Sequence, residues 1–585
     1  MSHRSYLTSL KLGYGLYDAL QKEGYNRQLF IKDLIAGVTV GILTIPISMA
    51  LATGIGVSPI YGLYTAIVAG IFTALAGGSR YSIAGPTASF VILLIPVTEA
   101  YGVLGLVLVS LLAGLLLILM AFLRFGRWVE YIPEAITLGF TTGIATLIIF
   151  LQMKDFFGLY LIDLPNDFIQ RLWVMFENME SLHWEATVVG ITTLIFMVIW
   201  KKLKTPVPGH LPGLVIASIA VFYWNQQGAN ILVVADLFDE IPHYLPPFQG
   251  GWIIESLSTM SYEDIWEMFK TLLPVAAALA VLGAMESLFC AVVLDKSAGT
   301  RHSPNSELLG QGIGNVFSSL FGGFASSGAI ARSITNLRAG AVSPISAVIH
   351  SFIVLFAIYF LAEFLMHLPI PAMSALLILV AWRMSEFNRA IALVKSKSPD
   401  VWVYLTCFGS ILLFDVVVAV IIGMVLASIL FVKEIADMTK LQDIHHEARY
   451  HSEVMPEDWS FYRIQGPLFF AAAERLFSEL APTIVGKKGI VIQMDAVTII
   501  DTGGLSALRR FVSSAEANGV DVYLSELQFQ PLKTLARYGL DNFGEHFKLF
   551  SSLDDAQDEV IKMHQIEENR TEEQDLNTRE PSVKE

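Results

Sequence analysis

The sequence predicts a polytopic α-helical membrane protein that is followed by a small α/β domain. Apolar residues make up 54% of the 585 residues, charged residues 16%, and the mean hydropathy is +0.58. The charge is uneven, because 43 of the 153 residues from 433 to 585 are charged, against 48 of the 432 before them. Soluble domains carry about 25% charged residues. A membrane body therefore precedes a domain of soluble composition.

The same composition excludes several classes of function. The net charge of −15 offers no basic surface for a nucleic-acid backbone. The two cysteines, Cys290 and Cys407, lie in apolar runs and cannot form a disulfide framework or a zinc site. No Walker A, HExxH, GxSxG or CxxC motif is present. We therefore expect no enzyme activity, no metal and no cofactor.

The membrane body contains fourteen apolar segments, seven on each side of a polar stretch at 226–265. A span needs about 20 apolar residues, or fewer where the helix is broken. The first set lies within 33–225 and the second within 266–438. The segments are 33–54, 61–76, 86–101, 103–123, 132–151, 185–200, 211–225, 268–294, 306–322, 328–341, 344–366, 370–383, 400–414 and 416–432.

Loop charges set the orientation of these spans. Lys and Arg precede the first span, in the segment 1–32, and follow the fourth, sixth, eighth and twelfth spans. The stretch 226–265 has no Lys or Arg but has six acidic residues. Positive loops stay on the cytoplasmic side. We expect both termini in the cytoplasm and 226–265 outside it.

The two sets of seven spans correspond in order. Pro46 in the first span matches Pro274 in the eighth, and Gly77-Gly78 after the second matches Gly322-Gly323 after the ninth. Each Gly-Gly is followed by a short extended stretch and then by a helix start rich in small residues. An odd number of spans per half gives the halves opposite topology, as in the inverted repeats of secondary transporters. The alternative is that apolar composition alone produces the similarity.

The two interrupted segments predict an anion site. A helix that begins inside the membrane presents unpaired N–H groups and a partial positive charge, and two such ends facing each other hold an anion without another motif. The alternative is that small residues here only allow tight helix packing. The candidate residues are Gly85, Pro86, Thr87, Ala88, Ser327, Gly328, Ala329, Ile330 and Ala331.

Two ionisable residues lie deep in apolar surroundings beside this site. Arg332 is one helical turn beyond Gly328 and would supply a full positive charge, whereas Glu286 could carry a proton. Intramembrane charges are costly and usually face an interior cavity. The alternatives are a structural pair or an interfacial position for Arg332, and a fixed salt bridge for Glu286, with Arg332 as a candidate partner.

The C-terminal part alternates strands with helices. Strands at 459–464, 489–494 and 520–524 alternate with helices at 474–485, 501–517 and 531–538. This pattern predicts an α/β domain over 443–565. The tail 566–585 is polar and without periodicity, so we expect it to be disordered.

At this point two motifs resemble a known family. Pro59–Ala66 with Gly77–Arg80 resembles the signature of the sulfate permease (SulP) family of anion transporters, and Asp501–Leu505 resembles the signature of the STAS domain. Five further stretches resemble the proteobacterial C4-dicarboxylic acid uptake transporters of that family. They are 282–288, 305–308, 329–333, 340–350 and 466–474.

The resemblance implies a core domain of spans 1–4 and 8–11 and a gate domain of spans 5–7 and 12–14, with substrate between the starts of spans 3 and 10. It places the functional acid on Glu286 and the basic residue on Arg332. It implies proton-coupled uptake of succinate, fumarate or aspartate by an elevator-like movement. Sulfate or bicarbonate transport, coupled to H⁺ or Na⁺, and passive exchange or conduction are the alternatives, as is a receptor that signals through the soluble domain.

The resemblance also implies where the protein works and with what. It implies a homodimer in the bacterial inner membrane, surrounded by lipid, with small anions as ligands. The STAS domain could bind a cytosolic regulatory protein.

Overall fold

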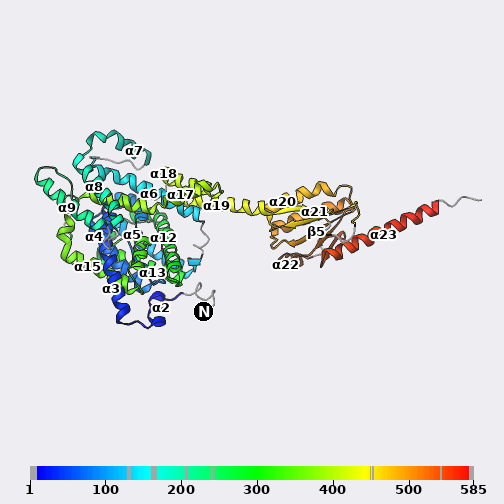
Figure 1. Cartoon of the computed structure of the whole chain (residues 1–585), viewed down its shortest axis with the longest axis horizontal. Coiled ribbons are helices and arrows are strands. Elements are labelled where there is room, and N and C mark those ends of the chain that lie inside the picture. Colours follow the sequence, from blue (N-terminus) through cyan, green and yellow to red (C-terminus); the bar gives the residue numbers. More distant parts are fainter. Residues whose placement is uncertain are drawn as a thin grey trace, which may run out of the picture. The chain divides into compact units, whose positions relative to one another are not determined.

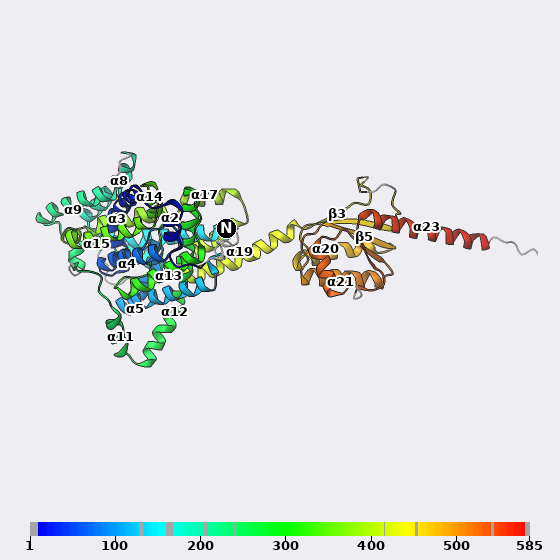
Figure 2. The same cartoon turned by 90° about the horizontal axis from the view of Figure 1, so that it is seen from below.

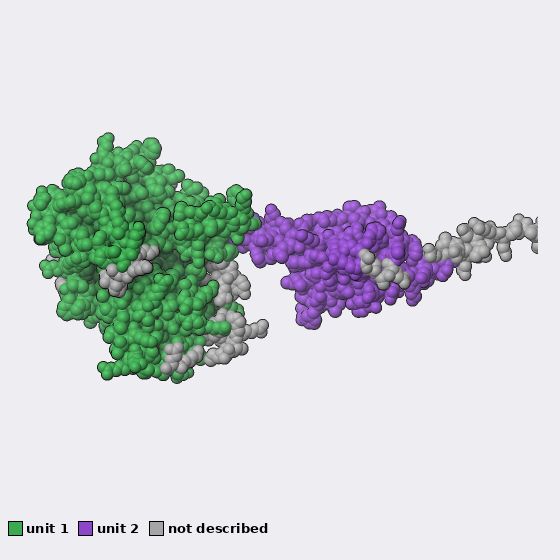
Figure 3. Space-filling view, viewed as in Figure 1, with its two compact units in different colours: residues 1–425 green, residues 426–585 purple. Residues whose placement is uncertain are grey.

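The computed structural model describes the residues 10–127, 133–159, 168–203, 209–238, 241–242, 244–414, 416–447, 449–450, 454–539 and 543–578. The chain divides into two compact units, residues 1–425 and 426–585 (Figure 3). Each unit is described by itself.

Unit 1 is a bundle of helices that matches the predicted spans (Figure 1). Seven of the described helices are long and apolar enough to cross a membrane. One of them, α5, contains two predicted spans, and its backbone leaves helical geometry at Gly102, with φ 58° and ψ −151°. The main helices are α2 (Tyr14–Glu23), α3 (Arg27–Ile55), α4 (Pro59–Ala76), α5 (Ala88–Phe122), α6 (Glu134–Phe157), α7 (Phe168–Glu177), α8 (Trp184–Trp200), α9 (His210–Gln226), α11 (Gly250–Ser258), α12 (Tyr262–Ala298), α13 (Pro304–Leu320), α14 (Ile330–Arg338), α15 (Ile345–Met366), α16 (Ile370–Met384), α17 (Phe387–Ser396), α18 (Asp400–Leu413) and α19 (Val416–Met438).

The helices of unit 1 pack in two groups. Helices α3, α4, α5, α12, α13, α14 and α15 pack mainly on one another, and α6, α8, α9, α16 and α18 form a second group. The first group contains the helices of the core domain that the resemblance implies, and the second contains those of the gate domain apart from α19. Within the stretch 226–265, predicted to be a polar loop, the chain forms α11, and α11 and the start of α12 project from the bundle (Figure 2).

Two very short strands lie inside the first group. β1 (Ala84–Gly85) and β2 (Ser327–Gly328) pair antiparallel, with Ala84 opposite Gly328 and Gly85 opposite Ser327. The Ala329 N–H extends the pairing by donating to the Ile83 carbonyl at 3.1 Å. The two predicted extended stretches, about 240 residues apart along the chain, are therefore hydrogen-bonded to each other.

Unit 2 is a five-stranded sheet with helices on both faces. The strand order is β3 (Lys440–Asp443), β4 (Trp459–Gln465), β5 (Gly489–Ala496), β6 (Asp521–Ser525) and β7 (Phe547–Phe550), with β3 antiparallel and the rest parallel. Helices α20 (Phe470–Leu480) and α21 (Thr502–Ala517) cover one face, α23 (Leu553–Thr578) covers the other (Figure 2), and α22 (Phe529–Tyr538) precedes β7. Successive residues of β5 point to opposite faces of the sheet, so Val491 and Ile492 lie in two separate hydrophobic cores.

Several predictions for unit 2 were wrong in their boundaries. The sheet begins at Lys440, before the predicted 443, because β3 pairs with β4. The predicted helix at 474–485 starts at Phe470 and continues after Leu480 as a 3₁₀ turn, and β3 and β7 were not predicted.

The predicted disordered tail is helical as far as Thr578, since α23 is held by the buried side chains of Leu553, Ala556 and Val560 and continues through Glu- and Gln-rich sequence. Residues 579–585 lie outside the described residues.

The close approach of α4 and α13 generates the first prediction. A Cβ on Gly310 would lie 2.3 Å from the Cα of Gly77, which is backbone and cannot move aside, whereas a Cβ on Gly409 of α18 would meet no atom within 4 Å. Overpacking costs about 1–3 kcal/mol. We expect Gly310→Ala to lower the thermal unfolding midpoint in detergent and Gly409→Ala to leave it unchanged or raise it. Equal midpoints for the two variants would contradict this packing.

Candidate functional site

The carboxylate of Glu286, in the middle of α12, meets hydroxyl groups from the two interrupted segments. The Ser89 hydroxyl, in the first turn of α5, donates a hydrogen bond to Oε1 of this carboxylate, and the Ser327 hydroxyl, in β2, donates one to Oε2. The Ser327 hydroxyl also lies 3.3 Å from the Thr87 hydroxyl. Glu286 thus joins the start of α5 to β2, at the point where the sequence predicts the anion site.

Arg332 lies in the first turn of α14 and reaches across to the opposite interrupted segment. Its side chain is buried, with 6% of the residue exposed. Its Nη2 donates to the Pro86 carbonyl at 2.7 Å, and its Nη1 has no hydrogen-bond partner within the described part of the chain. A buried guanidinium with an unused N–H group can bind an oxyanion directly.

Glycine at position 85 makes room for this guanidinium. A Cβ there would lie 2.7 Å from Arg332 Nη1, which is closer than van der Waals contact. The lack of a side chain at Gly85 therefore allows Arg332 to lie against the backbone of the opposite segment. Gly328 is less crowded, since its Cβ would lie 3.1 Å from both the Cα of Ser287 and the hydroxyl of Ser82.

Glu286 and Arg332 do not form a contact ion pair with each other. The ion pairs found among the described residues include no pair between them, and Nη1 of Arg332 is unpaired. The fixed salt bridge considered from the sequence is thus not formed. One buried cation and one carboxylate flank the same site, each with capacity for a further partner.

The helices α5 and α14, which begin at the two interrupted segments, both start without a side-chain cap. α5 starts at Ala88 after Thr87, α14 starts at Ile330 after Ala329, and neither Thr87 nor Ala329 caps its helix through its side chain. Pro86 lies just before α5, outside the helix. The N–H groups of the first turns, including Ala331, are the donors that such a helix end offers to an anion.

Polar side chains that were not singled out from the sequence hold β2 in place. Gln311 Nε2 donates to the Ser326 carbonyl at 2.7 Å, the Asn315 amide oxygen accepts from the Ser326 N–H at 2.8 Å, and the Ser287 hydroxyl accepts from the Gly328 N–H at 3.0 Å. Gln311 and Asn315 are four residues apart on α13, so they share one face. Two polar residues four positions apart in an apolar span are the sequence pattern from which Gln311 and Asn315 could have been predicted.

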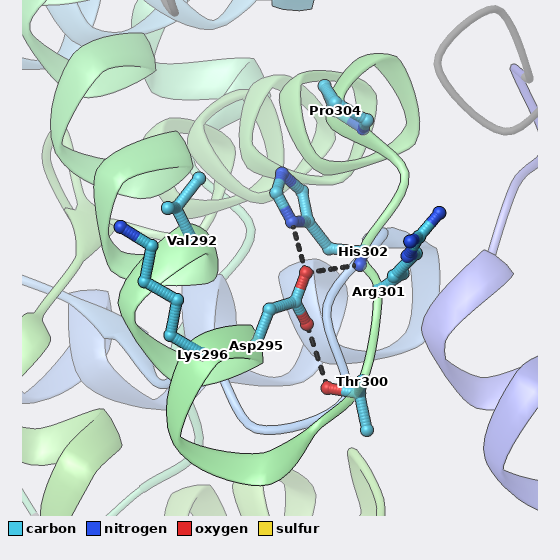
Figure 4. A pocket seen from close by; sticks show the side chains of 7 residues that line it. All are labelled: Val292, Asp295, Lys296, Thr300, Arg301, His302 and Pro304. Carbon is cyan, nitrogen blue, oxygen red and sulfur yellow. Dashed lines mark hydrogen bonds and ion pairs between the residues drawn. The ribbon is translucent and has the colours of Figure 1, made fainter. Parts of the chain in front are cut away.

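A surface pocket lies elsewhere, at the turn between α12 and α13 (Figure 4). Asp295 accepts hydrogen bonds from the Thr300 hydroxyl at 2.8 Å and from the His302 N–H at 2.7 Å. Lys296 and Arg301 point away from each other on opposite sides of this carboxylate (Figure 4). None of the residues that line this pocket belongs to the site of Arg332 and Glu286.

Comparison with known proteins identifies both parts of the chain. Residues 30–407 match the model of the sulfate permease family, and residues 451–556 match the STAS domain. The chain is 34% identical over 522 residues to the putative sulfate transporter YvdB of Bacillus subtilis, covering 88% of this chain and 95% of that protein. It is 25% identical to the bicarbonate transporter BicA of Picosynechococcus, covering 76% of this chain and 80% of that protein.

A solved structure supports the fold over almost the whole chain. The murine Slc26a9 anion transporter, described as inward-facing, superposes with a TM-score of 0.80 at 17% identity, covering 94% of each chain. At this identity the likeness concerns the fold alone. It confirms the predicted helical transporter fold with a C-terminal STAS domain, whereas the resemblance to dicarboxylate transporters remains a prediction.

The contact between Gly85 and Arg332 generates the second prediction. In Gly85→Ala the new methyl group displaces the guanidinium from its place beside Pro86, so we expect sulfate, used as the probe oxyanion, to bind more weakly in calorimetry on purified protein. Gly423→Ala is the control, because its Cβ meets Cys407 at an ordinary 3.5 Å. If Gly85→Ala binds sulfate with unchanged affinity, Arg332 does not contact the anion.

Proposed function

The chain belongs to the sulfate permease family of anion transporters, and we propose that it takes up an oxyanion, sulfate in the first place, together with a proton. The observation that carries this proposal is the buried guanidinium of Arg332, which has an unused N–H at the junction of two uncapped helix starts. A small anion bound there would meet one full positive charge and two partial ones.

The number of cations at the site favours an anion with one charged centre. Among the described residues that form the site, Arg332 is the one basic side chain. Sulfate and bicarbonate each fit one guanidinium, and the relatives named for these two ions support the same choice. A C4-dicarboxylate has a second carboxylate, which the start of α5 would have to hold. Succinate, fumarate or aspartate uptake is the second candidate, favoured by the motifs quoted above.

A proton is the ion that this arrangement couples most simply. An anion beside Arg332 would also lie near Glu286, and two negative charges in a site of low polarity repel each other strongly. Protonation of Glu286 removes the repulsion, so proton and anion would enter together. Na⁺ could act in the same way through the Ser89, Thr87 and Ser327 hydroxyls and is the alternative coupling ion. A passive exchanger would need no ionisable group here.

The movement would carry the site past the gate helices. β1, β2, Glu286 and Arg332 all belong to the first group of helices, whereas the Ser89 hydroxyl lies 3.6 Å from the sulfur of Met384 on α16 of the second group. A shift of the first group against the second would expose the bound anion to either side. As part of the same proposal, the protein works as a homodimer in the inner membrane, with both termini in the cytoplasm.

Arg332 tests the site. We expect Arg332→Ala to abolish sulfate uptake into proteoliposomes and to weaken binding by roughly 10- to 150-fold, since a hydrogen bond to a charged group contributes about 1.5–3 kcal/mol. Arg338→Ala, at the other end of α14, is the matched control. The wild type is assayed with labelled sulfate, bicarbonate and succinate. Normal sulfate uptake by Arg332→Ala, or uptake of succinate alone by the wild type, would contradict the proposal.

Glu286 tests the coupling. Glutamine preserves the shape of the side chain but cannot take up a proton, so Glu286→Gln should lose sulfate accumulation driven by an inward proton gradient while keeping sulfate exchange. Glu363→Gln, at the end of α15, serves as the control. Uptake is measured at two internal pH values, with and without Na⁺. Concentrative, proton-driven uptake by Glu286→Gln would show that another group carries the proton.

A further inference from the structure

The helix α2, which precedes the first span, packs on the loop that leads into β1. Its buried face consists of Gly15, Asp18 and Ala19, at the i, i+3, i+4 spacing of one helix side. The N–H group of Gly15 donates a hydrogen bond to the carbonyl of Gly77, in that loop, at 3.1 Å. The proposed transport cycle uses no residue of α2, and these contacts therefore indicate a further role.

A buried ion pair joins α2 to the same loop. The Asp18 carboxylate accepts a hydrogen bond from Nε of Arg80 at 2.9 Å and lies 2.8 Å from Nη2, which also donates to the Asp18 backbone carbonyl at 3.2 Å. The side chains of Arg80 and Asp18 are 7% and 8% exposed. A buried ion pair adds little to stability, because the cost of removing both charges from water offsets their attraction. Its directed bonds do fix a geometry.

The loop that Arg80 anchors leads directly to the anion site. Arg80 lies five residues before Gly85, and every residue from 76 to 91 is buried. Side chains of α13 and α14 hold the backbone of this loop as well, namely Glu307, Ser333 and Asn336. A segment packed on all sides passes a displacement on rather than absorbing it. The place of Arg80 therefore affects that of Pro86, whose carbonyl accepts from Arg332 at 2.7 Å.

We propose that Asp18 and Arg80 are positioning residues of the anion site. They fix the loop in front of β1, so that the Pro86 carbonyl and the first turn of α5 stand where the Arg332 guanidinium and the anion meet them. The inference rests on the proposed function, because it needs an anion bound against Arg332. It adds α2, which lies outside the fourteen predicted spans, to the elements that shape this site.

A purely structural role of the pair leads to a different expectation. If Asp18 and Arg80 only held α2 to the bundle, two apolar side chains of similar size would preserve stability and anion binding together, since buried ion pairs can be replaced in this way without loss of stability. If the pair positions the loop, the same replacement preserves stability but not binding, because apolar side chains hold no backbone through directed hydrogen bonds.

Calorimetry of sulfate binding to the full-length purified protein separates these two roles. We expect the double variant Asp18→Leu/Arg80→Met to unfold near the wild-type temperature and to bind sulfate roughly 2- to 30-fold more weakly. Arg80→Lys should also bind sulfate more weakly, because lysine keeps the charge but lacks the planar fork of arginine. Glu386→Gln is the matched control, since Glu386 forms an ion pair with Arg389 at 2.8 Å, just after α16 of the second helix group.

Hydrogen–deuterium exchange of the protein without sulfate gives a second readout that needs no anion. We expect the double variant to exchange faster than the wild type in peptides that cover residues 77–90, because the loop and β1 open more often once their anchor is lost. Glu386→Gln should exchange there at the wild-type rate.

Unchanged sulfate affinity in the double variant or in Arg80→Lys would overturn the positioning role, and Arg80→Lys decides alone if the double variant does not fold. Weaker binding with wild-type exchange over 77–90 would also overturn it, since the loop would not have moved, as would an equal loss of affinity in Glu386→Gln. Absence of sulfate binding to the wild type would instead overturn the proposed function, and the effect on affinity with it.

Discussion

The antiparallel pairing of β1 with β2 is the constraint on which the rest of the site depends. Backbone N–H and C=O groups inside a membrane protein must find partners, because water does not supply them there. Two extended segments from opposite halves of the chain satisfy each other through Ala84–Gly328 and Gly85–Ser327. This pairing sets the starts of α5 and α14 side by side, and their unpaired N–H groups are then directed to a shared site. In the proposed function, this pairing supplies the backbone donors of the site, and Arg332 adds the full positive charge.

The buried acids of the core group show how charge is used in two different ways. Asp33 and Glu307 accept backbone N–H groups: Asp33 from Val342 and Ser343, and Glu307 from Gly78 and Ser79 at 2.8 and 2.7 Å. These bonds hold the two loop segments that carry the N–H groups in place. Glu286 is held by hydroxyl groups, which can rotate and either donate or accept. A proton on Glu286 would therefore break no backbone hydrogen bond, which fits its proposed role in coupling.

Much of this arrangement could be predicted from the sequence, for identifiable reasons. The Pro and Gly-Gly positions of the two halves located the interrupted segments, and the isolated charges in apolar runs located Glu286 and Arg332. The sequence could not predict that Arg332 donates a hydrogen bond to the Pro86 carbonyl and does not pair with Glu286. That choice depends on how segments 246 residues apart in the chain pack together. Gln311 and Asn315 were missed because single polar residues in apolar helices resemble ordinary packing. In unit 2, β3 and β7 escaped prediction because each has only four residues.

The central claim is that the anion lies between the starts of α5 and α14, against Arg332. Anomalous diffraction from crystals grown with selenate, a heavier analogue of sulfate, tests it most directly, because the signal locates the selenium without reference to any functional assay. We expect a single strong peak within hydrogen-bonding distance of the Arg332 guanidinium and of the first-turn N–H groups of the two helices, and we expect Arg332→Ala to lose it. A peak confined to the pocket of Asp295, Lys296 and Arg301, or one that persists unchanged in Arg332→Ala, would contradict it.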